Sequence, residues 1–351
     1  METDQKITIK DIARLTGLSK GTVDRVLHNR EGVSKKSYAK VMKVIQDLGY
    51  EPNLFASLLA HNKKRIIAVL LPAYKEGEFW ELAEPGLKKG AEAVRAFGIE
   101  VHRISYDQYN LESFHKAEEE VLALNPSGVV LAPMFKDDSF IFVRRLQEKH
   151  IPYVYIDTKL ECGEYLAYFG MPLYQSGYLC AAILTDAQED VKEVAAVRVQ
   201  RDKHWQSDPT IYRREGFIDY ISKHFPSCKM RSVFIDPKKP EEIDGILEEF
   251  FDLHPGVRHI AMYNSRIYLV TPFLERHPER NYRVVGFDNL AANLSALKEG
   301  TVTALIAQRP DEQIHNAIGT LSDYIVFGKA PAKRDNFVSM DILTRYNEEY
   351  Y

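Results

Sequence analysis

Residues 8–27 read TIKDIARLTGLSKGTVDRVL, and this stretch predicts two short helices joined by a tight turn. Ile12, Ala13 and Leu15 recur at helical spacing, so the first helix has one apolar face. Gly17 follows the last helical turn, where a left-handed backbone commonly ends a helix and glycine adopts it without strain. The pattern therefore predicts a first helix that ends at Gly17 and a second helix that starts soon after it.

The second helix is expected to begin after Ser19, because a serine hydroxyl can accept a hydrogen bond from a free backbone N–H group. Val23 and Val26 would be buried, which leaves Lys20 and Arg25 on the exposed face. Such helix pairs occur in ordinary bundles, but they are also the helix-turn-helix signature, whose second helix enters the major groove of DNA. Arg is the residue type that best recognises guanine, so Lys20 and Arg25 favour the DNA-binding interpretation.

Charge is distributed unevenly along the chain. Residues 1–65 carry 13 Lys and Arg against 7 Asp and Glu, a net charge of +6, whereas the remainder carries −10 in a chain whose total is −4. A basic segment ahead of an acidic body indicates a polyanionic partner for the first segment only. The charge pattern therefore supports DNA as the partner of the helical head.

The composition is typical of a globular protein, since 45% of the residues are hydrophobic and 27% are charged. No run of about 18 or more apolar residues occurs, so we expect neither a membrane span nor a membrane partner. The opening residues METDQKITIKD lack the basic and apolar regions of a signal peptide. Three widely spaced cysteines, Cys162, Cys180 and Cys228, indicate reduced core thiols, and these features together predict a cytoplasmic protein.

The helix-turn-helix and the later stretch VSKKSYAKVMKVIQDLGYEPNLFASLLA resemble the DNA-binding region of the LacI/GalR family of bacterial transcriptional regulators. The resemblance covers residues 8–60 almost without gaps, and weaker similarity continues to the C-terminus. It implies that Lys20, Gly21 and Arg25 read bases and that Thr22 contacts the DNA backbone. The full set of DNA-contacting positions that it implies is Thr8, Ser19, Lys20, Gly21, Thr22, Arg25, His28, Asn53, Ala56 and Leu59.

Two positions depart from the family pattern. Asp24 stands where the family usually has Ser, and His28 stands where it usually has Asn. An acidic side chain that faces phosphate is unfavourable, so two alternatives are open for Asp24. It accepts a hydrogen bond from a cytosine amine, or it pairs with a nearby Lys.

A third helix and a short apolar segment complete the predicted head. The third helix carries one apolar stripe, made of Tyr38, Val41, Ile45 and Leu48. Pro52 then breaks the chain, and residues 53–60 form a helix too short to be stable alone in water. One interpretation of this segment is a plain linker. The other, which the resemblance implies, is a hinge helix that orders when two copies meet on DNA, with Leu59 wedged between base pairs from the minor groove. We favour the hinge, because its apolar side chains would be costly on an exposed linker.

From residue 65 onward, apolar strand patterns alternate with helix patterns. The first series starts with RIIAVLLP at residues 65–72, and a second series starts after Gly170. This alternation predicts parallel sheets with right-handed crossovers, arranged as two doubly wound lobes with a cleft between them. The fold class is thus α/β after a small all-α head, and it resembles the type I periplasmic-binding-protein fold that the LacI/GalR family carries. The expected domains are residues 1–52 for the helix-turn-helix head, 53–64 for the hinge helix and linker, and 65–351 for effector binding and dimerisation, with lobe 1 at about 65–169 and 308–330 and lobe 2 at about 170–307 and 331–351.

Polar residues directly after predicted strands are candidates for a ligand site in the cleft. Asp157 ends IPYVYID, Asp288 ends RVVGFD and Gln308 ends TVTALIAQ. Carboxylate, amide and guanidinium groups can each bond two adjacent sugar hydroxyls, while an aromatic ring covers the apolar face of the sugar. Each such Asp or Asn, taken singly, is also explained as a turn or a helix cap. The candidate effector-binding residues are Phe79, Trp80, Asp157, Trp205, Arg213, Asn264, Asp288 and Gln308.

Signatures of catalysis are missing from the sequence. It contains no GxGxxG after a strand, no GxxxxGK[ST] loop and no GxSxG turn, and its histidines show no metal-ligand spacing. We therefore expect no enzyme activity, no cofactor and no metal. The sequence predicts a homodimeric repressor that binds a pseudo-palindromic operator in double-stranded DNA and responds to a small polar effector, a sugar or a sugar derivative. Two alternatives are a sugar-binding receptor without a DNA role and a regulator that responds to a nucleobase or nucleoside.

Overall fold

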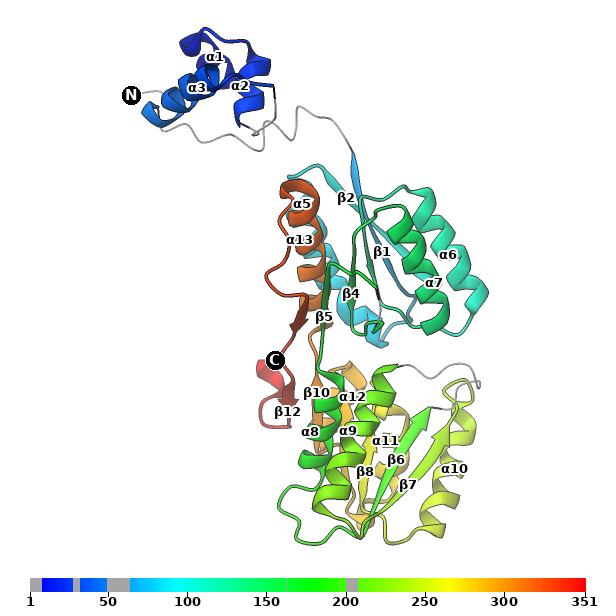
Figure 1. The fold of residues 1–351 in the computed structure, drawn as a ribbon. Helices are drawn as coiled ribbons and strands as arrows, with labels where there is room; N and C mark the ends of the chain where they lie inside the picture. Colours follow the sequence, from blue (N-terminus) through cyan, green and yellow to red (C-terminus); the bar gives the residue numbers. More distant parts are fainter. Residues whose placement is uncertain (1–7, 28–31, 49–63, 162, 200–207) are drawn as a thin grey trace. The chain divides into compact units, whose positions relative to one another are not determined.

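The computed structural model describes residues 8–27, 32–48, 64–161, 163–199 and 208–351 (Figure 1). The chain divides into two compact units, Met1–Lys63 and Lys64–Tyr351. We refer to the first unit as the head and to the second as the body, and each is described by itself.

The described part of the head contains three helices, α1 (Ile9–Thr16), α2 (Lys20–Leu27) and α3 (Lys35–Asp47). The backbone N–H of Thr8 donates to Asp11 Oδ2 at 3.0 Å, which caps the start of α1. Gly17 ends α1 in the left-handed conformation, with a φ of 64°, as the sequence predicts. Ser19 Oγ accepts a hydrogen bond from the backbone N–H of Thr22 at 3.1 Å and so caps α2.

The core of the head is small and apolar. Ile12, Val23 and Val41, one residue from each helix, are fully buried. Leu15 was expected on the buried face of α1, but 54% of it is exposed. Thr16 takes the buried position instead, because its hydroxyl can donate to the backbone carbonyl of Ile12 at 2.7 Å and so needs no water.

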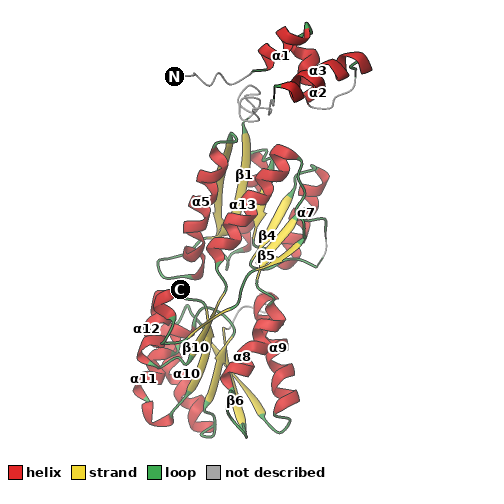
Figure 2. Cartoon of the chain, turned by 90° about the vertical axis from the view of Figure 1, so that its left-hand side faces the viewer, coloured by secondary structure: helices red, strands yellow, loops and turns green. Residues whose placement is uncertain are grey.

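Among the described residues, the body holds two six-stranded sheets, one in each lobe (Figures 1 and 2). The first sheet contains β1 (Arg65–Pro72), β2 (Ile99–Tyr106), β3 (Gly128–Leu131), β4 (Tyr153–Ile156), β5 (Ala167–Gly170) and β11 (Asp335–Phe337). The second contains β6 (Glu193–Val199), β7 (Lys229–Ile235), β8 (His259–Met262), β9 (Arg283–Phe287), β10 (Ala304–Ala307) and β12 (Asp341–Leu343). The strand orders are β11-β5-β4-β3-β1-β2 and β12-β10-β9-β8-β6-β7. Neighbouring strands are parallel except that β12 runs antiparallel to β10.

Helices cover both faces of each sheet, as the alternating sequence patterns predict (Figure 1). The first sheet packs against α5 (Glu84–Arg95) and α13 (Pro310–Phe327) on one face, and against α6 (Leu111–Ala123) and α7 (Lys136–Glu148) on the other. The second sheet packs against α8 (Leu173–Leu184) and α9 (Asp208–His224) on one face, and against α10 (Pro240–Leu253), α11 (Thr271–Arg276) and α12 (Ala291–Glu299) on the other. Short 3-10 helices are η1 (Phe79–Ala83), η2 (Ile267–Leu269), η3 (Pro278–Arg280) and η4 (Glu348–Tyr350).

Glycines let two pairs of helices approach closely. A Cβ atom at Gly177 in α8 would lie 1.7 Å from the carbonyl oxygen of Arg213 in α9. A Cβ atom at Gly86 in α5 would lie 1.9 Å from the carbonyl oxygen of Asp311 in α13. Both distances are far shorter than van der Waals contact, so no larger residue fits at either position unless a helix moves. The position of Arg213 therefore depends on a glycine in the neighbouring helix.

The chain passes between the lobes after β5, after β10 and after β11, and Figure 2 shows these segments between the two sheets. The segment NFVSMDIL is divided, since β11 pairs with β5 in the first sheet and β12 pairs with β10 in the second. The prediction that all of residues 331–351 belong to lobe 2 is therefore wrong for β11, because Asn336 pairs with Phe169 at the edge of the first sheet. Two further elements, β5 and α12, are not predicted from the sequence patterns.

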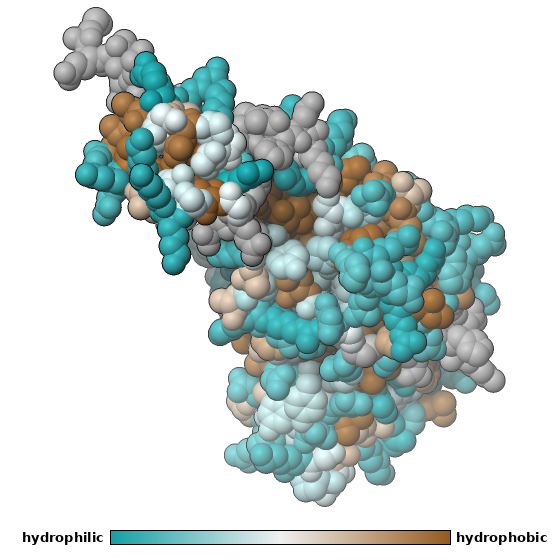
Figure 3. All heavy atoms as spheres, turned by 45° about the horizontal axis from the view of Figure 1, so that its top comes forward, coloured by the Kyte–Doolittle hydropathy of each residue, from teal (hydrophilic) through white to brown (hydrophobic). Residues whose placement is uncertain are grey.

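On the face shown in Figure 3, the surface of the body is mostly hydrophilic, and hydrophobic residues form separate small patches. Large apolar side chains such as Ile141 and Phe337 are each 59% exposed. Scattered apolar side chains of this kind are normal on globular proteins and indicate no particular partner. None of the described helices is both long and apolar enough to cross a membrane.

Candidate functional site

A cavity of about 480 Å³ is lined by residues of both lobes of the body. Its first-lobe residues follow β1, β2, β3 and β4, and many of its second-lobe residues lie at the ends of β6, β8, β9 and β10. Residues at the carboxyl ends of parallel strands commonly form ligand sites, and this volume suits a small molecule. The polar lining residues are Glu78, Gln108, Asp157, Arg198, Thr210, Arg213, Arg214, Tyr263, Asn264, Ser265, Arg266, Tyr268, Asp288 and Gln308.

The cavity brings together seven of the eight residues that the sequence nominates for effector binding. These seven are Phe79, Trp80, Asp157, Arg213, Asn264, Asp288 and Gln308. The eighth, Trp205, lies outside the described residues. The prediction that they contact an effector stays a prediction, but their convergence on one cavity is a property of the fold.

Asp157 and Asp288 occupy equivalent places in the two lobes. Each directly follows a central strand, and each has a positive φ, 63° for Asp157 and 67° for Asp288. Short polar side chains tolerate this left-handed backbone better than most residues do. The backbone N–H of Asp157 donates to the carbonyl of Phe169 at 3.0 Å, and that of Asp288 donates to the carbonyl of Ile306 at 3.0 Å. The sheets therefore fix both carboxyl groups at the cavity wall.

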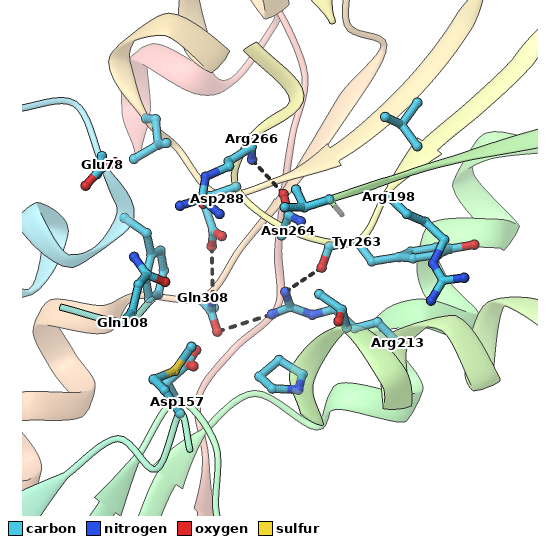
Figure 4. A pocket seen from close by; sticks show the side chains of 18 of the residues that line it. Glu78, Gln108, Asp157, Arg198, Arg213, Tyr263, Asn264, Arg266, Asp288 and Gln308 are labelled. Carbon is cyan, nitrogen blue, oxygen red and sulfur yellow. Dashed lines mark hydrogen bonds between the residues drawn. The ribbon is translucent and has the colours of Figure 1, made fainter. Parts of the chain in front are cut away.

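Arg213, Gln308 and Asp288 form a chain of hydrogen bonds, which we call the polar chain (Figure 4). One amino group of Arg213 donates to Gln308 Oε1 at 3.4 Å, and Gln308 Nε2 donates to Asp288 Oδ1 at 3.0 Å. The other amino group of Arg213 donates to the carbonyl of Tyr263 at 3.0 Å. Arg213 is only 3% exposed, and its Nε has no hydrogen-bond partner among the described residues. The polar chain thus holds donors and acceptors in fixed positions at the cavity wall.

Burial changes the acidity of both aspartates. Removal from water raises the pKa of Asp288 to about 7, although the positive charge of Arg213 and the hydrogen bond from Gln308 oppose the change. Burial likewise raises the pKa of Asp157 to about 6, again against the attraction of Arg213. Near neutral pH, each carboxyl group is therefore close to its titration point and can accept or donate hydrogen bonds to a polar ligand.

The aromatic lining residues differ in exposure. Phe79 is half-buried, whereas Trp80 is only 4% exposed and belongs to the core of the first lobe. Their ring centroids are 5.1 Å apart in an edge-to-face arrangement, so Phe79 packs against the buried Trp80. Phe79 is accordingly the more accessible aromatic face on this side of the cavity.

Asn264 makes a local contact as the sequence also allowed. Its Oδ1 accepts a hydrogen bond from the backbone N–H of Arg266 at 3.0 Å, which is the pattern of an Asx turn. The amide nitrogen of Asn264 donates no hydrogen bond to any described residue. A turn role and a ligand role are therefore compatible at this position.

Sequence reasoning missed several polar lining residues. Among them are Gln108 from the first lobe and Arg198, Arg214 and Arg266 from the second. Arg198 lies within β6, so a search for polar residues behind strand ends could not find it. A signal was present, because Arg198 interrupts the apolar stretch EVAAVRV, where a charged residue is unusual.

The three residues nominated for base contact lie on one helix of the head. Lys20, Gly21 and Arg25 all lie on α2, and all three are exposed. Asp24 lies on the same helix and is half-buried. The basic residues of α2 are therefore free of the core of the head and available to a polyanion.

The remaining positions nominated for DNA contact are caps or lie outside the described residues. Thr8, Ser19 and Thr22 take part in the capping of α1 and α2, so a structural role explains them without DNA. The positions that lie outside the described residues are His28, Asn53, Ala56 and Leu59.

Among the described residues, no group of three or more His, Cys, Asp or Glu side chains could hold a metal ion. Cys180 is buried and Cys228 is partly buried, and both are free thiols, while Cys162 lies outside the described residues. Burial raises the pKa of the Cys180 thiol to about 12, so this side chain is an unreactive core residue.

Two family models match the chain. Residues 8–53 match the bacterial regulatory proteins of the lacI family, and residues 67–330 match the periplasmic binding protein domain. The second match covers most of the chain and fits the two lobes of the body.

Individual proteins show the same relationship. The transcriptional regulator MalR of Streptococcus pneumoniae is 24% identical over 154 residues, which cover 44% of this chain and 46% of MalR, so the chain spans less than half the length of that relative. The ribose operon repressor of Lactococcus lactis is 28% identical over 293 residues, 81% of each chain. A crystal structure described as a LacI transcriptional regulator from Bacteroides fragilis is 33% identical, with a TM-score of 0.78, and the match covers 82% of this chain and 100% of that one. The chain therefore belongs to the LacI family of bacterial regulatory proteins.

Proposed function

We propose that the chain is a homodimeric repressor of transcription whose affinity for operator DNA is controlled by a small polar effector in the cavity of the body. The effector is a sugar or a sugar derivative. The protein acts in the cytoplasm and catalyses no reaction. The head reads a pseudo-palindromic operator, with one copy of α2 in the major groove of each half-site.

The polar chain carries the proposal for the effector. A sugar presents adjacent hydroxyl groups, each of which donates and accepts a hydrogen bond. Asp288, Gln308 and Arg213 offer acceptors and donors side by side, and Phe79 offers an aromatic face to the apolar side of a sugar ring. An apolar ligand would exclude water from Arg213 and Asp288 without adding a hydrogen bond to either, and the Nε of Arg213, which has no partner among the described residues, would stay unsatisfied.

The position of the cavity supports control of the head by the effector. Asp157 comes from the first lobe, whereas Arg213 and Asp288 come from the second, so a ligand that contacts all three favours one arrangement of the lobes. Coupling between an effector site and a DNA site is typically worth about 1–3 kcal/mol, or roughly 5- to 150-fold in operator affinity. The relative from Lactococcus lactis is named a ribose operon repressor, which supports repression and a sugar effector for this chain too.

The test begins with thermal unfolding of the full chain against a panel of sugars, sugar derivatives and nucleosides, because a ligand that binds the folded state raises the unfolding temperature. Operator fragments are selected from a random DNA pool with the same protein. Operator affinity is then measured with and without the ligand for the parent chain and for Arg213→Ala. We expect the ligand to change operator affinity in the parent and not in the variant, while the variant still binds DNA.

Arg283→Ala is the matched control. Arg283 also donates to a backbone carbonyl, that of Ile183 at 2.8 Å, but it does not line the cavity. The control should respond to the ligand as the parent does. A response by Arg213→Ala equal to that of the parent would show that Arg213 only supports the fold. Stabilisation by nucleosides and not by sugars would replace the sugar proposal with the nucleoside alternative.

A further inference from the structure

Two arginines line the second-lobe side of the cavity away from the polar chain. Arg198 lies near the end of β6, and Arg214 lies in α9 directly after Arg213. We call Arg198 and Arg214 the arginine pair. The guanidinium carbon of Arg198 lies 4.9 Å from the centroid of the Phe234 ring, which also lines the cavity. This stacking holds the guanidinium group of Arg198 in place before any ligand arrives.

Neither arginine is neutralised by the described part of the chain. No carboxylate among the described residues forms an ion pair with Arg198 or Arg214, and no hydrogen bond reaches Arg198 in Figure 4. Arg198 is half-buried, and burial together with the nearby positive charge of Arg214 lowers its pKa. Arg214 is exposed and Arg198 is half-buried, so water screens the repulsion between the two positive charges only in part, and an anion that binds both guanidinium groups would be favoured.

The rest of the cavity does not offset this charge. Among the described residues, the lining contains four arginines and three carboxylates. Two of the carboxylates, Asp157 and Asp288, face Arg213, whose positive charge acts on both. In the view of Figure 4, Glu78 and Asp288 lie on the opposite side of the site from Arg198. The positive excess of the described lining residues therefore lies at the arginine pair.

The start of α9 adds to the positive potential. Pro209 and Ile211, in the first turn of this 17-residue helix, line the same cavity as the arginine pair. The N-terminal end of a helix carries a partial positive charge from its aligned peptide dipoles. The start of α9 therefore adds a partial positive charge to the wall of the cavity that holds the arginine pair, and the acidic residue Asp208 begins the same helix.

We propose that the effector is an anionic sugar, whose phosphate or carboxylate group binds the arginine pair while its hydroxyl groups bind the polar chain. The proposal deepens the function proposed above and rests on it. Guanidinium groups bind both kinds of oxyanion through paired hydrogen bonds, so the two sources share one recognition chemistry. A neutral sugar would satisfy the polar chain and leave the arginine pair without a counter-charge.

The first experiment uses inorganic phosphate as the probe. Thermal unfolding of the full chain is measured in phosphate and in chloride at equal ionic strength, for the parent and for the double variant Arg198→Gln/Arg214→Gln. The control is Arg144→Gln, because Arg144 also stacks on a ring, that of Phe140 at 4.6 Å, but lies outside the cavity. Phosphate should stabilise the parent and the control, and the double variant should bind it about tenfold more weakly or worse. An equal phosphate effect in all three proteins would overturn the proposal.

The second experiment compares matched ligands and separates the two anions. Glucose, glucose 6-phosphate and glucuronate, and the same three forms of galactose, are titrated into the parent and the double variant by calorimetry. The anionic form should bind the parent at least about tenfold more tightly than its neutral counterpart, and the double variant should lose this preference. The stronger of phosphate and carboxylate identifies the natural group. A neutral sugar that binds the parent as tightly as its anionic forms would overturn the proposal.

Failure of the proposed function would be seen separately. Selection of operator fragments with the unmodified chain tests DNA binding without any effector. If no fragment is bound while phosphate still distinguishes the parent from the double variant, the anion site stands and the regulatory function is refuted. If operator is bound and phosphate has the same effect on every protein, the regulatory function stands and the anion site is refuted.

Discussion

Replacement of Asp288 by Asn is the change whose effect can be worked out most fully. Asp288 is 2% exposed, and its Oδ1 accepts a hydrogen bond from Gln308 Nε2 at 3.0 Å. The amide oxygen of Asn can accept the same bond, so the substitution removes the charge and keeps the shape. The variant therefore isolates the free energy that the buried charge costs the folded protein.

The pKa of Asp288 gives the size of that cost. Burial raises it from 3.8 to about 7, although Arg213 and the bond from Gln308 oppose the rise. The folded state therefore keeps a proton that the unfolded chain loses, and the free energy of unfolding falls as the pH rises from about 4 to 7. Above that range the ionised side chain costs about 4 kcal/mol, of which about 2 to 3 kcal/mol accumulates between pH 5 and pH 8. The Asn variant does not titrate and avoids this cost.

Urea unfolding of the full chain at pH 5 and pH 8 measures the difference. The fluorescence of Trp80 and Trp205 reports on the body, which contains both tryptophans of the chain. Relative to the parent, the Asn variant should be more stable at pH 8 than at pH 5 by about 2 to 3 kcal/mol. Any effect of the substitution that does not depend on charge cancels in this comparison. A stability difference that is the same at both pH values would refute the reasoning, because Asp288 would then be ionised or protonated throughout.

Four further outcomes follow from the structure and the sequence. Asp335→Asn should have the opposite pH dependence. Burial raises the pKa of Asp335, but the hydrogen bonds from Lys159 at 2.5 Å and Tyr165 at 2.7 Å, together with the nearby positive charges, outweigh it and lower the pKa. In urea unfolding, the variant should be less stable than the parent at pH 8, and the difference should shrink below pH 4, where the parent loses this stabilisation. Gly177→Ala should destabilise the body by about 1–3 kcal/mol, because the added Cβ would meet the backbone of α9. Gly245→Ala in α10 should stabilise the body by about 0.5–1 kcal/mol, because no atom lies within 4 Å of the added Cβ and alanine favours a helix over glycine. Leu59→Ala should weaken operator binding in gel shift and leave ligand binding unchanged, if Leu59 unstacks a base step. Sedimentation should give a dimer, and a stable tetramer or a monomer at micromolar concentration would contradict the two-fold operator.

The sequence predicts the architecture well wherever a local pattern determines an element. RIIAVLLP has the pattern of a buried strand, and it becomes β1, which lies between β3 and the edge strand β2. Gly17 can adopt the left-handed backbone that ends a helix, and α1 ends beside it. The Ser19 hydroxyl can cap a helix start, and α2 begins beside it. Leu15 shows the limit of this reasoning, since a hydroxyl that bonds to the preceding turn let Thr16 take the buried place instead.

Elements that depend on distant pairing escape local reasoning. β5 has four residues and β11 has three, and neither shows a recognisable alternation. Their pairing with each other joins residues 167–170 to residues 335–337, which no short-range pattern contains. The division of NFVSMDIL between two sheets is likewise set by where the chain crosses between lobes, and not by its composition.

One rule of parallel sheets predicts part of the candidate site. Asp157, Asp288 and Gln308 directly follow strands, and the carboxyl ends of parallel strands meet, so the rule brings them together. Arg198 and Gln108 are set by side-chain direction and by the packing of two lobes, which the rule does not include. Arg198, which belongs to the proposed anion site, is signalled in the sequence only by a charged residue within the apolar stretch EVAAVRV.

The cavity itself gives a physical reason why a ligand should influence the lobes. Asp157 in the first lobe and Asp288 in the second are both buried, and the charge of Arg213 lowers the cost of ionising each of them. The attraction between Asp157 and Arg213 acts across the boundary between lobes, so it weakens if the lobes separate. A ligand that bonds to both carboxyl groups adds contacts that exist in one lobe arrangement only. Such a ligand creates a free-energy difference between the two lobe arrangements. This difference sets the largest change in DNA affinity that the ligand can cause.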